Sequence, residues 1–254
     1  MRTFKVDKLT VNFLDSRDLM GKKAAEDIAA AIVALQEEKD EINIIFAAAP
    51  SQNETLAHLI EHKEIDWTKI NAFHMDEYLG LPKDSPQKFA IYLDEHIFSK
   101  VPFKSVNYVD CSAEDIDAEC ARYESLLKKY PTDIVILGIG ENGHIAFNDP
   151  GVADFNDKVF VKKALLDDVC RNQQVNDGCF ATIDDVPKFA LTLTVPALLA
   201  GRYMFCSVPA HTKAWAVNEM LTAEIGENCP ATILRKHDSA ALYCDPDSSA
   251  KVTL

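Results

Sequence analysis

The sequence contains no apolar run long enough to cross a membrane, and its first twenty residues lack the apolar core of a signal peptide. It also lacks an excess of positive charge, since its net charge is −14 at pH 7. A chain this acidic is not expected to bind nucleic acid or a membrane, because the phosphates of nucleic acid and of anionic lipids would repel it. We therefore expect a cytoplasmic protein in which local donors hold any anionic ligand.

The seven cysteines form no Cys-x-x-Cys pair, and their number is odd. This usage is typical of reduced, mostly structural thiols in a cytosolic protein. The chain also lacks linkers, internal repeats and low-complexity tracts. Its 254 residues, 48% of them apolar, are enough for one large α/β domain or for two small ones.

Apolar runs typical of buried strands alternate with helical patterns along the chain. The runs are 42–48, 70–75, 133–138, 190–195, 202–208 and 240–244, and residues 3–14 predict an edge strand. The helices are predicted over 16–39, after Ser51, and over 86–100, 112–130 and the residues after Pro209. Residues 151–189 are polar and give no clear element. The alternation predicts a single three-layer α/β/α domain over residues 1–254.

Polar side chains and glycines follow the strand predicted at 133–138. The glycines permit tight turns with positive φ, and they are Gly138, Gly140 and Gly143. The polar residues come among and after them, and they are Asn142, His144 and Asp149. In open α/β sheets ligands bind at the carboxyl ends of strands. A histidine beside an acid suits proton transfer at oxygen, because imidazole titrates near neutrality and the acid fixes its tautomer.

Asp76 and Glu77 follow the strand predicted at 70–75. A carboxylate at a strand end suits proton abstraction next to a carbonyl, but the two acids fit a turn or a helix cap equally well. His74 and Asp76 could face the same way, yet no second cluster of His or Cys accompanies them, so we expect no metal site.

Ser51 and Glu54 follow the strand predicted at 42–48 with the spacing of a capping box. The alternative is that this helix start also holds an anion, because its free N–H groups and its dipole favour one. Lys213, near the start of a later helix, would suit a phosphate, or it is an ordinary surface lysine.

Two long segments resemble the signature segments of the glucosamine-6-phosphate deaminase/isomerase family, which shares a superfamily with the 6-phosphogluconolactonases. They are FHMDEYLGL at 73–81 and LGIGENGHIAFNDPG at 137–151. Shorter similar stretches lie at 115–124, 186–192, 211–213 and 230–234, so the resemblance runs from about residue 20 to the C-terminus. The phrase GHIAFN favours the deaminase branch. The resemblance implies a modified Rossmann-like, mostly parallel sheet.

In that family a ring-opened 2-amino-2-deoxyhexose 6-phosphate isomerises to a ketose imine, which hydrolyses to fructose 6-phosphate and ammonia without a metal or organic cofactor. The resemblance implies that Asp76 moves a proton from C2 to C1. It implies that His144 transfers protons during ring opening, with Asn142 and Asp149 as its partners. The residues it assigns to substrate or phosphate are Ser51, Gln52, Asn53, Lys213, Glu77, Gly140 and Gly143. The resemblance implies a small sugar phosphate as the binding partner. It also makes a homo-oligomer possible, because family members are often oligomers.

Four positions depart from the family pattern. The phosphate loop, usually Gly-Gly followed by Ser or Thr and Pro, reads AAPS at 48–51. Asn142 stands where Asp is common, and Asp149 where Glu is usual. Residues 176–180 lack the family's phosphate-binding arginine, for which Arg171 is the nearest candidate. These departures leave open which amino-sugar phosphate is used. They also leave open a lactone hydrolase and a non-catalytic sugar-phosphate sensor.

Overall fold

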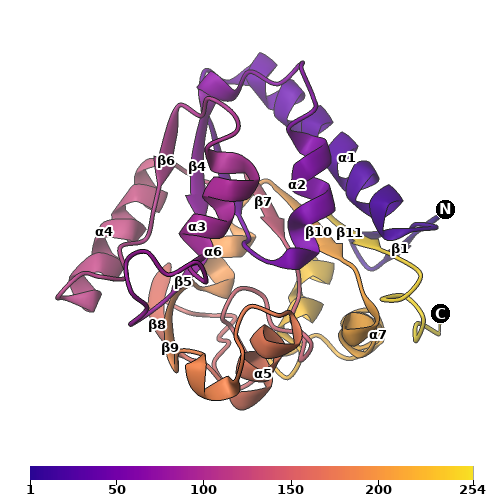
Figure 1. The fold of residues 1–254 in the computed structure, drawn as a ribbon. Coiled ribbons are helices and arrows are strands. Elements are labelled where there is room, and N and C mark those ends of the chain that lie inside the picture. The colour runs from indigo at the N-terminus through magenta and orange to yellow at the C-terminus, as the bar shows by residue number, and fades with distance from the viewer. Residues whose placement is uncertain (254) are drawn as a thin grey trace.

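The computed structural model describes residues 1–253 and confirms the α/β class (Figure 1). The strands of its main sheet are β1 (Arg2–Val6), β2 (Leu9–Phe13), β3 (Ile42–Phe46), β4 (Ile70–His74), β6 (Ser105–Asn107), β7 (Ile134–Leu137), β10 (Tyr203–Val208) and β11 (Ala240–Cys244). Their order is β1-β2-β11-β10-β7-β3-β4-β6, and only the β1–β2 pair is antiparallel. The sheet is therefore mostly parallel, as predicted.

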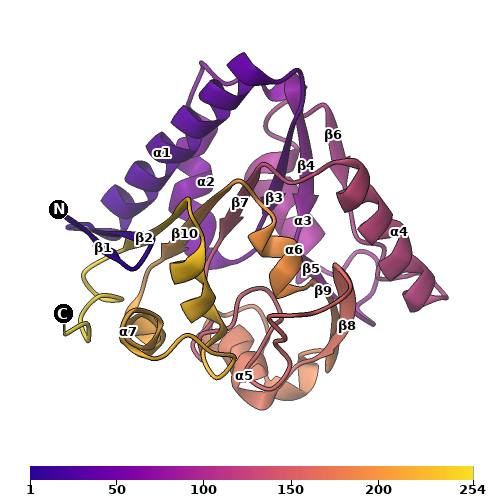
Figure 2. The same ribbon diagram turned by 180° about the vertical axis from the view of Figure 1, so that it is seen from behind.

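Helices cover both faces of this sheet, as Figures 1 and 2 show from opposite sides. Ile134 and Ile136 of β7 face one hydrophobic core, which contains apolar residues of α1 (Arg17–Glu38), α2 (Asn53–Leu59) and α3 (Phe89–Leu93). The alternate residues, Val135 and Leu137, face a second core. It contains residues of α4 (Ile116–Lys129), α6 (Val195–Leu199) and α7 (Ala214–Thr222). Each fully buried Ile or Leu contributes about 1.5–3 kcal/mol, so both faces stabilise the fold. None of the helices within residues 1–253 is long and apolar enough to span a membrane.

A second, antiparallel sheet combines the strand predicted at 190–195 with one strand from the segment 151–189, in which no element was predicted. Its strands are β5 (Asp76–Tyr78), β8 (Val161–Leu165) and β9 (Phe189–Leu193), in the order β5-β9-β8. In Figure 1, β8, β9 and α5 (Asp168–Asn176) lie together at the lower end of the molecule. One residue, Met75, separates β4 from β5, so the chain passes directly from the main sheet into the second sheet.

Two local predictions were wrong. Residues 3–14 form the β1–β2 hairpin instead of one strand, because the chain turns at Asp7, whose φ is 51°. The predicted capping box at Ser51 and Glu54 does not form. The Glu54 carboxylate accepts a bond from Arg17 Nε at 2.8 Å, and the Ser51 hydroxyl accepts one from Gln52 Nε2 at 3.0 Å. No side chain caps α2.

Candidate active site

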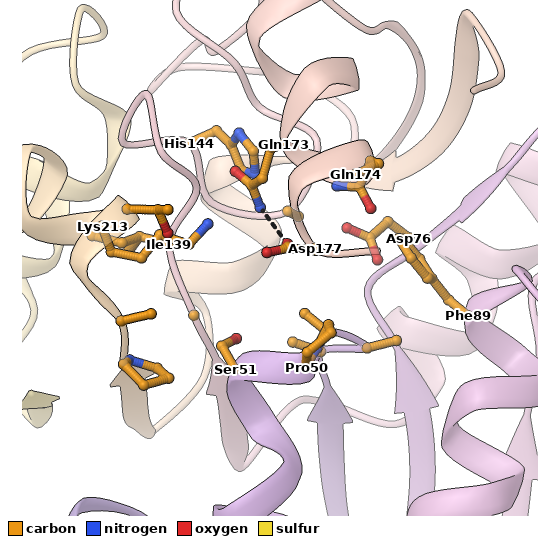
Figure 3. Close-up of a pocket in the computed structure, with 18 of the residues that line it drawn as sticks. Pro50, Ser51, Asp76, Phe89, Ile139, His144, Gln173, Gln174, Asp177 and Lys213 are labelled. Atoms are coloured by element: carbon orange, nitrogen blue, oxygen red, sulfur yellow. Dashed lines mark hydrogen bonds between the residues drawn. The ribbon is translucent and has the colours of Figure 1, made fainter. Parts of the chain in front are cut away.

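A pocket lies beyond the carboxyl ends of β3, β4 and β7 (Figure 3). Its polar wall combines residues from the strand ends with residues from the end of α5 and the turn before α7: Ser51, Asp76, His144, Gln173, Gln174, Asp177 and Lys213. Its apolar wall includes Phe89 and Phe147. The structure thus brings Ser51, Asp76, His144 and Lys213 together, four residues that lie far apart in the sequence.

Asp76 is the first residue of β5, where the chain has just left the main sheet. It pairs with Thr192 of β9, which holds the backbone in place, and its side chain lines the pocket. Only 6% of the residue is exposed. Burial, and then the neighbouring Glu77, raise the pKa of Asp76 well above its usual range. A carboxyl group with a raised pKa is a stronger base once ionised, which suits a proton shuttle.

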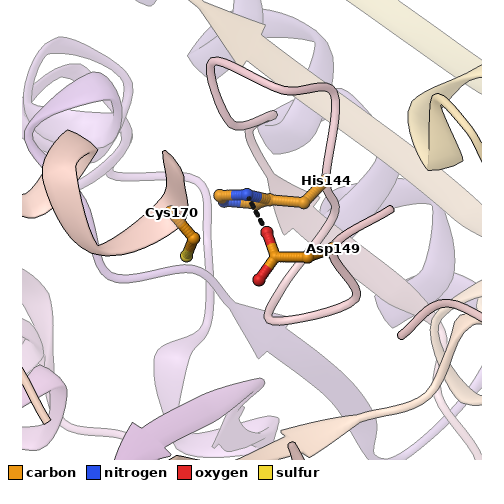
Figure 4. A group of neighbouring side chains, drawn as sticks. All are labelled: His144, Asp149 and Cys170. Carbon is orange, nitrogen blue, oxygen red and sulfur yellow. Dashed lines mark ion pairs between the residues drawn. The ribbon is translucent and has the colours of Figure 1, made fainter. Parts of the chain in front are cut away.

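His144 lines the pocket, and its Nδ1 lies 2.8 Å from Oδ1 of the fully buried Asp149 (Figure 4). Burial alone would raise the pKa of Asp149, but the charge and hydrogen bond of His144, with smaller contributions from Asn142 and Cys170, outweigh it and lower this pKa. Asp149 is therefore a carboxylate that can fix the ring and stabilise its protonated form. Asn142 does not bond to the imidazole. Its amide nitrogen donates to Asp149 at 3.0 Å, and its amide oxygen accepts the backbone N–H of His144 at 3.1 Å.

The glycines of this loop serve two different purposes. Only Gly143 has the positive φ expected from the sequence, at 82°, and neither Gly138 nor Gly140 does. Gly140 is needed for space, because a Cβ there would lie 2.1–2.4 Å from atoms of the His144 ring. Neither Gly140 nor Gly143 lines the pocket. They shape the loop that carries His144, and the structure gives them no contact with the cavity.

Cys170 completes a group of three buried side chains with His144 and Asp149 (Figure 4). Their candidate ligand atoms lie within 4.8 Å of one another, and within residues 1–253 this is the one group of three or more His, Cys or acidic residues that could hold a metal. Such a site would share His144 and Asp149 with the ion pair described above. Burial, and then the nearby Asp149, raise the pKa of Cys170 well above its usual range, so the thiol stays protonated. The expectation of a metal-free site remains a prediction.

Lys213 lies at the opposite side of the pocket from Asp76 in the view of Figure 3. It is 4% exposed, and its Nζ has no hydrogen-bond partner among the described residues. Burial lowers its pKa, although Asp177 and Glu141 oppose that effect. An unpaired buried amine is costly unless an anion binds it, so this nitrogen marks the anion end of the pocket.

Four of the residues assigned to substrate or phosphate have structural partners instead and do not line the pocket. Glu77 accepts the backbone N–H groups of Tyr78, Phe89 and Ala90, two of which begin α3. The remaining three are held by other protein groups. Gln52 donates to Ser51 and to the Ser207 carbonyl, and Asn53 accepts a bond from Tyr92. Arg171 donates to Asp168 and to the carbonyls of Ile183 and Val186. Its guanidinium is engaged away from the cavity, which removes it as the replacement phosphate arginine.

Five polar residues of the pocket were not assigned to a site from the sequence: Arg17, Thr212, Gln173, Gln174 and Asp177. The last three belong to the polar segment in which no clear element was recognised, and α5 brings them over the pocket. Gln173 Nε2 donates to Asp177 at 3.3 Å (Figure 3). No spacing signal in the sequence could have found the three residues at α5, because their placement depends on how the second sheet packs.

Comparison with known proteins shows the family to which the chain belongs. A family model described as glucosamine-6-phosphate isomerases/6-phosphogluconolactonase matches residues 15–243. The chain belongs to this family. It is 32% identical to a glucosamine-6-phosphate deaminase of Listeria innocua over 229 residues, which cover 90% of this chain and 94% of that protein. It is 30% identical to one of Lactobacillus delbrueckii subsp. bulgaricus over 226 residues, 89% and 92% of the two chains.

Solved structures of the family have the same fold. A monomeric glucosamine-6-phosphate deaminase superposes with a TM-score of 0.85 at 29% identity, covering 95% of this chain and 99% of that one. A 6-phosphogluconolactonase of Thermotoga maritima gives a TM-score of 0.73 at 25% identity, covering 92% and 98%. The family therefore includes deaminases and lactonases with this fold. Which of the two reactions a member catalyses has to be decided by the residues of its pocket.

Proposed function

We propose that the protein is an amino-sugar phosphate isomerase and deaminase that converts glucosamine 6-phosphate, or a close isomer such as galactosamine 6-phosphate, and water to a ketose 6-phosphate and ammonia. The observation that carries this proposal is that a buried carboxylate, Asp76, and the unpaired Lys213 line one pocket together with His144. We expect it to act in the cytoplasm and to need no cofactor.

The roles of these side chains follow from the reaction. The phosphate binds at Lys213 and fixes the sugar in the pocket, which lowers the entropy cost of reaching the reactive geometry. His144, backed by Asp149, moves a proton between the ring oxygen and the C1 hydroxyl as the ring opens to the aldehyde. Asp76 then takes the proton from C2 and returns it to C1. The enolamine becomes a ketose imine, and water adds to its C2 and releases ammonia.

A lactone hydrolase is the second candidate, and the likeness to the Thermotoga maritima lactonase structure motivates it. There His144 would activate water, and no carbon acid would be deprotonated. The buried Asp76 favours the deaminase, because a base with a raised pKa in the same pocket as the histidine suits removal of a proton from carbon.

The test is ammonia release, with glucosamine 6-phosphate, galactosamine 6-phosphate and 6-phosphogluconolactone assayed in parallel. We expect turnover of an amino sugar that Asp76→Asn and His144→Ala reduce by about 100-fold or more, the size of a general acid–base contribution. The exposed Asp84→Asn is the matched control and should keep full activity. Lactone hydrolysis without ammonia release would select the hydrolase. Binding of a sugar phosphate without turnover would select the sensor.

A further inference from the structure

A second cation, Arg17, lies on the wall of the pocket with Ser51 and Lys213. It is the first residue of α1. Its Nε donates to Glu54 at 2.8 Å, and its Nη2 donates to the Pro50 carbonyl at 2.7 Å. A guanidinium carries five N–H donors in a planar fork. Its Nη1 has no hydrogen-bond partner among residues 1–253, so Arg17 has donors left for a ligand.

The position of Arg17 is built into the fold. A Cβ on Gly21, one helical turn further along α1, would lie 2.3 Å from the Glu54 Cβ and 2.7 Å from the Glu54 carbonyl carbon. The absence of that Cβ lets α1 approach the backbone of α2 closely. The first turn of α1 therefore lies beside the Pro50–Ser51 turn that borders the pocket, and the two hydrogen bonds of Arg17 hold its side chain there.

The anion end of the pocket needs a second positive charge. A phosphate monoester carries up to two negative charges near neutral pH, and Lys213 supplies one positive charge. Asp177 lines the same pocket and opposes an anion. Arg171, the arginine nearest to the expected position in sequence, is bonded elsewhere. Of the arginines in the described chain, Arg17 is the one that lines the cavity.

We propose that Arg17 binds the phosphate of the substrate together with Lys213, from a different element than the arginine that the family pattern supplies. This assignment deepens the proposed function and rests on it. The guanidinium donates to phosphate oxygens through Nη1, while the pair with Glu54 orients it.

The experiment measures binding by calorimetry, independently of turnover. The probes are 2-amino-2-deoxyglucitol 6-phosphate, which has no aldehyde and cannot isomerise, its unphosphorylated counterpart, and inorganic phosphate. We expect Arg17→Ala to weaken the two phosphate-containing probes by about 10-fold or more, as for loss of a charged hydrogen bond, and to leave the unphosphorylated probe unchanged. In turnover, KM should rise by a similar factor at constant kcat.

Glu54→Gln is the matched control, because it weakens the same ion pair but keeps the guanidinium. It should bind phosphate as tightly as the wild type or more tightly. Equal weakening in Arg17→Ala and Glu54→Gln would mean that Arg17 only supports the turn, and would overturn the assignment. So would unchanged binding in Arg17→Ala, even if the wild type releases ammonia.

Phosphate binding that depends on Arg17 in a protein that releases no ammonia would support the assignment and reject the proposed function. Failure of the wild type to bind either phosphate-containing probe would reject both.

Discussion

The orientation of the His144 ring depends on a residue that has no side chain. Gly140 leaves the space that the imidazole occupies, and a Cβ there would lie within 2.4 Å of three ring atoms. We predict that Gly140→Ala lowers kcat by about 100-fold, because displacing a catalytic group by an ångström has an effect of that order. The measurement is steady-state ammonia release, with binding of the phosphorylated glucitol probe as a check on the pocket.

Gly226→Ala is the control for this prediction. A Cβ at Gly226 meets no atom within 4 Å, and its backbone is not in the left-handed region. It should keep wild-type kcat. If Gly140→Ala were equally active, the ring position in the structure would not be the catalytic one.

The buried Asp76 is expected to lower the free energy of unfolding near neutral pH. Its folded-state pKa is raised by burial and by Glu77, whereas in the unfolded chain it ionises near the ordinary value of about 3.9. The folded state therefore loses stability from this group as pH rises above that value, through the interval up to the folded-state pKa. We predict that Asp76→Asn increases the free energy of unfolding at pH 7–8 by about 0.5–2 kcal/mol while it reduces turnover by about 100-fold or more.

Urea unfolding at several pH values measures this difference. The gain in Asp76→Asn should shrink as pH falls, and it should vanish below the unfolded-state pKa of about 3.9, where the wild-type carboxyl is protonated in both states. The exposed Asp84→Asn should give no such pH-dependent gain. A loss of stability in Asp76→Asn at every pH would contradict the argument.

At the scale of elements, Glu77 connects β5 to α3. Its carboxylate accepts three backbone N–H groups at 3.0–3.1 Å, including those of Phe89 and Ala90 in the first turn of α3. Burial raises the pKa of Glu77, and these three bonds oppose that effect. We predict that Glu77→Ala lowers the free energy of unfolding by about 1–3 kcal/mol, because it leaves buried donors unpaired.

The denaturation midpoint in urea measures this loss, and Glu77→Gln, which keeps one accepting oxygen, should lose less. KM for the sugar phosphate should change little in Glu77→Gln. A large rise in KM with unchanged stability would instead support the substrate-binding role implied by the resemblance.

Elements whose signal is local could be predicted from the sequence. The apolar runs at 42–48, 70–75 and 133–138 became β3, β4 and β7, because a strand buried on both faces must be apolar throughout. Asp76 and His144 could be predicted as site residues because they follow the carboxyl ends of two of these strands. The capping box failed because Glu54 pairs with Arg17, 37 positions earlier in the chain, and local spacing cannot show such a partner.

The other half of the pocket could not be predicted. Gln173 and Gln174 belong to α5, and Asp177 is its C-cap. The place of this helix depends on the pairing of β8 with β9 and of β9 with β5. Arg171 belongs to the same helix but faces the carbonyls of Ile183 and Val186. Which residues of a polar helix face a pocket is decided by tertiary packing.

At the scale of the whole molecule, the charge of the protein opposes its proposed substrate. The net charge is −14, and a sugar phosphate is also an anion, so the long-range field repels it and only the pocket cations attract it. The Debye length falls from about 30 Å at 0.01 M salt to about 10 Å at 0.1 M, which screens the distant charges more than those in the pocket. We predict that raising NaCl over this range lowers KM by about 2-fold at constant kcat.

Sodium sulfate at equal ionic strength separates screening from competition. Sulfate screens the same field, but it also resembles phosphate and should compete at Lys213, so KM should rise where chloride lowers it. Unphosphorylated 2-amino-2-deoxyglucitol is a cation, and its binding should weaken with NaCl, because the field that repels phosphate attracts an ammonium group. If KM for the sugar phosphate instead rose with NaCl, the local field of Lys213 and Arg17 would outweigh that of the rest of the chain, and these two cations would attract substrate at long range as well as bind it.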